Sequence, residues 1–110
     1  MATLFKNNLI AGLGTTETVI LTTASNARTT VVGLSLANLT GSIILASIRV
    51  ADPIAGTTAY FMKDVIIPPN QSIRAVNGGE RLILAPTTSL LLAANTDNSL
   101  DVVMSYIEII

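Results

Sequence analysis

The sequence of 110 residues contains no cysteine, no histidine and no tryptophan. Without cysteine and histidine the chain cannot form disulfides, zinc sites with thiolate or imidazole ligands, or a nucleophilic site built on Cys or on a Ser–His pair. Charge is also scarce, because six basic and seven acidic side chains make up 12% of the residues and give a net charge of −1. A protein that binds nucleic acid needs a basic face, so we predict no nucleic-acid partner.

Long hydrophobic runs are absent as well. The longest unbroken run is Leu90–Ala94, far shorter than the ~20 residues that a membrane-spanning helix requires. Near the N-terminus, Lys6 lies inside the first apolar stretch, whereas a signal peptide carries its positive charge before a clean apolar segment. We therefore expect no membrane partner and no export, and a chain that is made in the cytoplasm and is kept or assembled there.

Apolar and hydroxyl-bearing residues are abundant. Half of the chain is hydrophobic, and 14 Thr, 8 Ser and 8 Asn supply most of its polar groups. β-Branched residues suit a pleated surface, and short β-rich runs are separated by turn signals every 8–14 residues. This spacing predicts an all-β fold, an antiparallel β-sandwich of jelly-roll or immunoglobulin-like type with about 8 strands. Residues 17–110 are expected to form a single domain with one modest core.

Two predicted strands have faces of unequal hydrophobicity. In the run that begins at Thr29, the larger side chains Val32, Leu34 and Leu36 are expected in the core, which leaves Val31 outside. In residues 58–67 the more apolar side, expected to face the core, comprises Ala59, Phe61, Lys63, Val65 and Ile67.

A hairpin is predicted in the second half of the chain. Ser72–Val76 and Arg81–Ala85 flank the turn residues Asn77–Glu80. The Asn77-Gly78 pair suits a type I′ turn, because both central residues of that turn need a positive φ.

Both ends of the chain contain unexplained apolar residues. Residues 1–16, where Asn and Gly interrupt the apolar side chains, form either an edge strand or an arm that docks on a neighbouring copy. The last run, Leu100–Ile110, is apolar on both faces, so either a loop covers it or its outer face meets another subunit. Val31 and Leu45 raise the same question as exposed aliphatic residues. The candidate interface therefore comprises Leu4, Phe5, Leu9, Ile10, Leu13, Val31, Leu45, Ile107 and Ile109.

The motifs that could form a cofactor, metal or catalytic site are incomplete. Gly12-Leu13-Gly14 lacks the third glycine and the following helix of a dinucleotide site. Asp97–Asp101 offers oxygen atoms but not the ligand spacing of a calcium loop. The seven acidic residues are scattered, so no pair of carboxylates is evident for hydrolysis. We predict no catalytic residue, no metal site, no cofactor and no enzymatic activity.

Several segments, in order along the chain, resemble a set of small β-sandwich structural proteins of tailed bacteriophages. The resemblance covers roughly residues 17–110 and rests on Thr29–Asn38, the Thr40–Ser42 turn with the strand to Val50, Tyr60–Asn70, Arg81–Leu84 and Asp101–Glu108. It implies a component of a virion that is assembled in the host cytoplasm. It suggests a capsid decoration (cement) protein, a homotrimer that bridges subunits of the major capsid protein or binds another virion protein. A tail, neck, baseplate or fibre-associated module is the alternative that it leaves open.

A third hypothesis is a carbohydrate- or receptor-binding β-sandwich. Binding of this kind needs an exposed aromatic platform on which a sugar can stack. The chain offers only Phe5, Tyr60, Phe61 and Tyr106 for such a platform.

Overall fold

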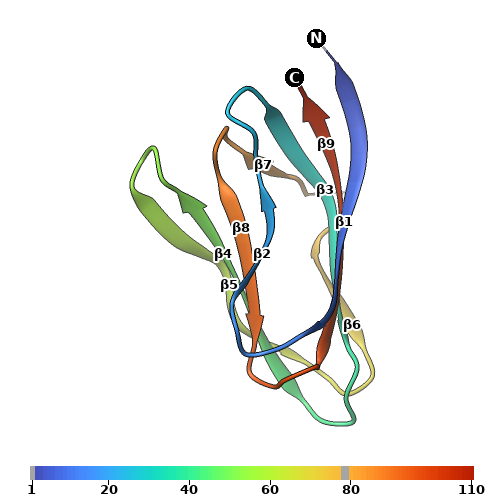
Figure 1. The fold of residues 1–110 in the computed structure, drawn as a ribbon. Coiled ribbons are helices and arrows are strands. Elements are labelled where there is room, and N and C mark those ends of the chain that lie inside the picture. The colour runs from blue at the N-terminus through green and yellow to red at the C-terminus, as the bar shows by residue number, and fades with distance from the viewer. Residues whose placement is uncertain (1, 78–79) are drawn as a thin grey trace.

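The computed structural model describes residues 2–77 and 80–110, and these residues form nine β-strands and no helix (Figure 1). The strands are β1 Thr3–Leu13, β2 Thr18–Thr22, β3 Arg28–Asn38, β4 Ile44–Asp52, β5 Thr57–Ile67, β6 Ser72–Val76, β7 Leu82–Leu84, β8 Ser89–Ala94 and β9 Leu100–Ile109. No helix in the described part of the chain is long and apolar enough to cross a membrane.

The strands form two antiparallel sheets. Sheet A has the order β1-β9-β3-β6, with β7 also paired to β3, and sheet B has the order β2-β8-β4-β5. The pairs are nested along the chain: β4 with β5, then β3 with β6 and β7, then β2 with β8, and last β1 with β9. A long antiparallel ribbon that is rolled over itself has this nesting, which is the topology of a jelly roll. The predicted antiparallel β-sandwich is thus confirmed, and the topology decides for the jelly roll over the immunoglobulin-like arrangement.

The core lies between the sheets and consists of every second residue of the central strands. On β9 the inward side chains include Val102, Met104 and Tyr106, which lie opposite residues of sheet B such as Ile48 and Leu92. A fully buried aliphatic side chain contributes roughly 1.5–3 kcal/mol, so this layer supplies most of the stabilisation.

A β-bulge in β3 reverses the predicted orientation of Val31. The pairing of β3 with β9 shifts register between Val31 and Gly33, so one extra residue, Val32, occupies the bulge. Val31 is 0% exposed and lies in the core, while Val32 is half-buried on the outer face. The prediction that Val31 is outside is therefore wrong, because an inserted residue moves all side chains before it to the opposite face.

A second irregularity changes the faces of β5. Asp64 adopts a positive φ of 50°, and its backbone N–H donates to the hydroxyl oxygen of Ser47 at 2.9 Å. On the N-terminal side of Asp64, Met62 packs against the core, while Phe61 and Lys63 are exposed, contrary to the predicted set. Val65 and Ile67, on the other side of the irregularity, do face inwards, as do their buried cross-strand partners Ala46 and Ile44.

The hairpin predicted over Ser72–Ala85 is not formed. β6 pairs with the second half of β3 and β7 with its first half, and both run antiparallel to it. β6 and β7 therefore run in the same direction along one side of β3, so they cannot pair with each other as a hairpin. The Gly78-Gly79 part of the predicted turn lies outside the described residues.

The β4–β5 hairpin extends beyond the core. Residues 53–61, which include its turn, are exposed throughout, and the hairpin leans away from sheet A (Figure 1). Ile54, at its tip, is 77% exposed.

The opposite end of the sandwich is fastened by one buried amide. Asn38 ends β3, and its Nδ2 donates to the carbonyl oxygens of Ser42, Ile67 and Pro68 at 2.8, 3.1 and 3.1 Å. Its Oδ1 accepts from the backbone N–H and the hydroxyl of Thr40, both at 2.8 Å. One side chain thus connects the β3–β4 loop to the β5–β6 loop.

An ion pair lies on the inner side of sheet A, near the end where the β4–β5 hairpin departs. Lys6 Nζ donates to Glu108 Oε1 at 3.0 Å, and the Glu108 side chain is 9% exposed. This hydrogen bond, together with the attraction of the Glu108 charge, raises the pKa of Lys6 above 10.5.

We predict that this ion pair makes the stability of the fold decrease at alkaline pH. A raised pKa means that the contribution of Lys6 is fully present below pH 10.5 and is lost as the pH rises through the pKa of the folded state. Lys6→Met should therefore lower the thermal midpoint at pH 8 and flatten its decline above about pH 10.5. Lys63→Met is the control, because Lys63 is exposed and has no ion pair within the described residues. An equal alkaline decline in wild type and Lys6→Met would contradict the assignment.

Candidate interaction surface

The outer face of sheet A carries a row of mostly apolar side chains that crosses four strands. Since β9 directs its even-numbered residues into the core, Ile107 points outwards, and its neighbours in register are Phe5 of β1 and Thr30 of β3. Thr30 is in turn paired with Ile83 of β7. Phe5 is 79% exposed and Ile83 is 77% exposed. Side chains from four separate segments of the sequence thus lie side by side on one surface.

A second row lies further along the same face. Leu9 of β1 is paired with Val103 of β9, and these side chains are 66% and 45% exposed. Between the two rows the paired positions are Asn7, Ser105 and Gly33, whose side chains are small or absent. Shallow hollows therefore separate the apolar rows. We call the face with both rows the sheet A surface.

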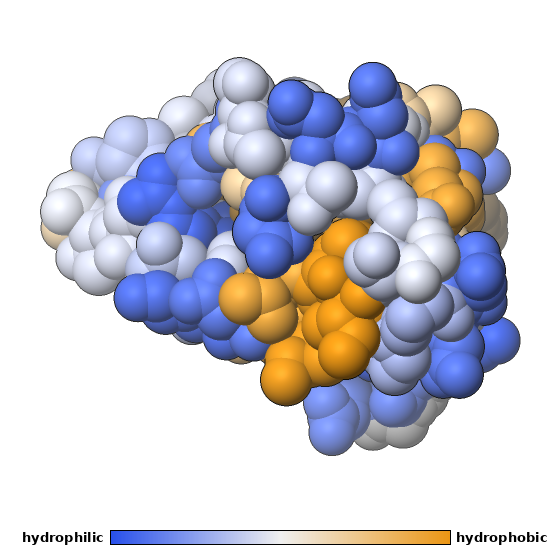
Figure 2. Space-filling model, turned by 90° about the horizontal axis from the view of Figure 1, so that it is seen from below, coloured by the Kyte–Doolittle hydropathy of each residue, from blue (hydrophilic) through white to orange (hydrophobic). Residues whose placement is uncertain are grey.

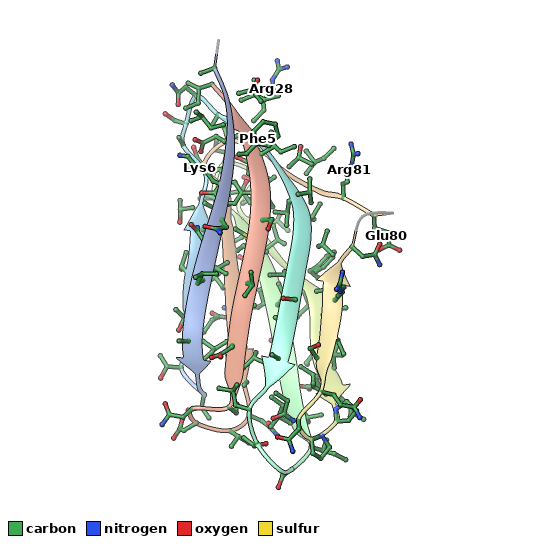
Figure 3. The ribbon with its side chains drawn as sticks, turned by 90° about the vertical axis from the view of Figure 1, so that its right-hand side faces the viewer. Phe5, Lys6, Arg28, Glu80 and Arg81 are labelled. Carbon is green, nitrogen blue, oxygen red and sulfur yellow. The ribbon has the colours of Figure 1, made fainter. Side chains whose placement is uncertain are left out.

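Three arginines border the sheet A surface. Arg28 begins β3 beside Ile109, Arg74 lies on β6 beside Ser35, and Arg81 precedes β7. Figure 3 shows Arg28 and Arg81 at the same end of the sheet as Phe5. Within the described residues, none of the three guanidinium groups has a hydrogen-bond or ion-pair partner.

The carboxylates, in contrast, are largely occupied within the chain. Asp97 accepts from Thr15 and Asp101 accepts from the N–H of Gly12, so the loop considered for calcium uses these oxygens to fasten the β1–β2 turn. A side chain on Gly14 would meet Asp97 Oδ1 at 2.9 Å, so close packing is the reason for that glycine. The part of the chain that the structure describes contains no group of three or more His, Cys, Asp or Glu side chains suited to a metal ion.

A second apolar patch lies on the end that Asn38 fastens (Figure 2). Leu39 and Ile43, both in the β3–β4 loop region, are exposed there, and Ile66 near the end of β5 is exposed beside its cross-strand partner Leu45. We call these four residues the end patch.

The predicted interface residues are distributed over four environments. Phe5, Leu9 and Ile107 come together on the sheet A surface, and Ile109 lies half-buried next to Arg28 at its margin. Leu45 belongs to the end patch. Leu4 points to the opposite side of β1 from Phe5.

Three other candidates lie in the protein's own core. Leu13 and Val31 are buried, and Ile10 is half-buried and packs against the core cluster, so placing Leu13 and Val31 at an interface was wrong. For Leu13 the cause is a register shift between Ile10 and Leu13, where Gly12 adopts a φ of 67°.

Both terminal segments belong to sheet A. Thr3–Leu13 form β1, an edge strand of sheet A within the sandwich. β9 lies in the middle of sheet A, and the exposure of Val103 indicates that no described loop covers its outer face.

No family model matches the sequence, and no curated protein matches it. Among solved structures, the chain is similar to one described as Bacillus endospore appendages that form disulfide-linked pili, with 9% identity and a TM-score of 0.55 over 96% of this chain and 86% of that chain. A pentameric capsid protein from metagenomic phage sequences is 23% identical, with a TM-score of 0.41 over 96% of this chain and 63% of that chain. A chain of infectious bursal disease virus, Gt strain, is 8% identical, with a TM-score of 0.46 over 98% of this chain and 30% of that chain. The first similarity concerns the fold alone, and the TM-scores of the other two are too low to support an argument.

Proposed function

We propose that this chain is a non-catalytic structural component of a virion, and that its sheet A surface attaches it to a neighbouring subunit with an apolar and acidic surface. The observation that carries the proposal is the in-register, largely apolar row from Phe5 to Ile83, bordered by three arginines that have no partner among the residues the structure describes. Contiguous exposed apolar side chains are typical of interaction sites. Unpaired guanidinium groups at the margin favour a partner that supplies carboxylates, because complementary charge steers association and sets orientation.

Two separate apolar surfaces favour a bridging role. The sheet A surface and the end patch lie on different sides of the sandwich, so one copy can contact two neighbours at once. Repetition of such contacts over a shell adds stability although each contact is weak. A capsid decoration protein, as the sequence resemblance implies, works in this way, with the major capsid protein as partner and a homotrimer as the expected assembly.

Assembly would rest on non-covalent contacts. The appendage protein that shares the fold is described as disulfide-linked, whereas this chain contains no cysteine. Buried apolar area, at roughly 25 cal/mol per Å² before the costs of association, is then the main source of affinity.

The number of copies per particle tests this role. We expect densitometry of gels of purified virions to find this chain in numbers comparable to those of the major capsid protein. A few copies per particle would instead support a tail, neck or baseplate location, and absence from virions would contradict the proposal.

A carbohydrate-binding role has less support. Tyr106 is buried, and Phe5 and Tyr60 lie on different sheets, so they cannot form one platform. The Tyr60 ring is also approached by Arg49 and Lys63, at 5.9 and 5.2 Å from its centroid. Arg49 is held there by its ion pair with Glu17, which lowers the pKa of that carboxyl group.

A further inference from the structure

The edge of sheet A at β1 has unpaired backbone groups. Among the described strands β1 pairs only with β9, and Ala2 and Ile110 exchange both backbone hydrogen bonds, each at 2.9 Å. Hydrogen-bonded positions alternate along an antiparallel pair, so the even-numbered residues of β1 bond to β9. The N–H and C=O groups of the odd-numbered residues, Thr3, Phe5, Asn7 and Leu9, therefore point away from the sheet.

This edge lacks the features that usually prevent pairing with another strand. Exposed edge strands are commonly short, or carry lysine, proline or a bulge. From Thr3 to Ile10 the pairing of β1 is regular, and this stretch contains no proline. Its one charge, Lys6, is bound to Glu108 on the inner side of the sheet. Figure 3 shows Phe5 and Lys6 on opposite sides of β1.

We propose that two copies of the chain join edge to edge, by antiparallel pairing of their β1 strands about a twofold axis at Asn7. The pairing would satisfy the unpaired backbone groups of both strands and make one continuous sheet from the two A sheets. A second copy is the occupant that fits, because the side-chain pattern of β1 is complementary to itself about Asn7.

The side chains favour this register over its two neighbours, which also place odd-numbered residues opposite each other. An axis at Lys6 would place Lys6 opposite the partner's Lys6, and like charges directly across a strand pair are destabilising. An axis at Asn8 would place Phe5 opposite the partner's Ala11. An axis at Asn7 places Phe5 opposite the partner's Leu9 twice, and Lys6 opposite the partner's Asn8. The hydrophobic pattern and the charge thus agree on one register.

The pairing is separate from the proposed function, although it extends the same surface. Phe5 and Leu9 end their rows at the margin of one copy, but in the pair they contact each other across the two β1 strands on the joined outer face. The contact adds a twofold axis to whatever assembly the sheet A surface forms.

Cysteine substitution tests the pairing directly, since the chain has no other cysteine. Asn7→Cys places two thiols across the axis at a Cα separation of about 5.5 Å, within the ~4.4–6.8 Å range for disulfides. Mild oxidation should then give a covalent dimer on a non-reducing gel. Ser105→Cys is the matched control, because Ser105 is exposed and paired with Asn7, but lies one strand further in. Its copies would be about 14 Å apart and should not cross-link.

Two outcomes would overturn the proposal: Asn7→Cys that cross-links no faster than Ser105→Cys, and a wild-type chain that light scattering finds monomeric at all concentrations.

A second variant tests the backbone bonds without cross-linking. Asn7→Pro removes an N–H that points out of the sheet, so pairing with β9 is kept, and the dimer should weaken at least tenfold, or about 1.4 kcal/mol, relative to Asn7→Ala. Equal dimerisation of the two variants would contradict the pairing. Attachment to virions does not depend on the pairing of β1 strands. A negative result in these experiments would therefore not contradict the proposed function, which the number of copies per virion tests.

Discussion

Replacing Asn38 by Asp is expected to lower the free energy of unfolding by about 4 kcal/mol at neutral pH, because it leaves a buried charge without compensation. The Nδ2 group of Asn38 donates to three carbonyl oxygens, and a carboxylate oxygen in its place would face these three acceptors with no hydrogen to offer. Denaturant unfolding followed by fluorescence or circular dichroism measures the loss. An unchanged midpoint would show that the loops are held together by other contacts.

The same variant has a signature in its pH dependence. The pKa of the buried carboxyl group should be raised above that of the unfolded chain, so the part of the penalty that is due to the charge is fully present above the folded pKa and disappears as the pH falls below about 4. Asn38→Ala should cost only about 2 kcal/mol, since it leaves unsatisfied groups but no charge. Its cost should not change with pH, which makes it the control for the titration.

Replacing Ile83 by Asp should weaken attachment to particles about 100-fold, or about 2.7 kcal/mol, because a charge would enter the centre of an apolar contact. Ile83 is 77% exposed in the free chain, so the fold should lose less than about 0.5 kcal/mol. Binding of purified variant to virions that lack the protein, measured by co-sedimentation, gives the ratio of affinities.

Ile54→Asp is the matched control for this experiment. Ile54 has the same exposure of 77%, but it lies at the tip of the β4–β5 hairpin on the other sheet. It should bind as wild type does. If both variants bind equally well, the sheet A surface is not the contact, and Ile43→Asp then tests the end patch.

The fold class could be predicted because composition and turn spacing depend on local chemistry. Thr-rich alternating runs identify strands. For β9, which is apolar on both faces, the sequence alone does not say which face is buried, and the structure places Val102, Met104 and Tyr106 in the core. Alternation fails where a residue is inserted, as at Val32, since a bulge changes the face of each side chain beyond it without a mark in the hydrophobic pattern. The hairpin over residues 72–85 failed for another reason, because both of its strands pair with the more distant β3.

The candidate surface was only partly visible in the sequence. Phe5 and Leu9 are candidates in the sequence because they are apolar residues of a segment that forms either an edge strand or a docking arm, and Ile107 is a candidate because its strand is apolar on both faces. Ile83 was missed, since it becomes a neighbour of Phe5 only through pairings among four segments of the chain. The arginines are also far apart in the sequence. Only the order of the strands in sheet A brings them to the border of one surface.

The projecting β4–β5 hairpin offers a site for display of foreign peptides. Its turn is exposed and includes Gly56 at a φ of 70°, and it points away from both apolar surfaces. Loop tips of this kind accept insertions because few contacts are lost. An epitope placed between Ala55 and Gly56 would therefore be presented on every subunit while the adhesive faces stay available.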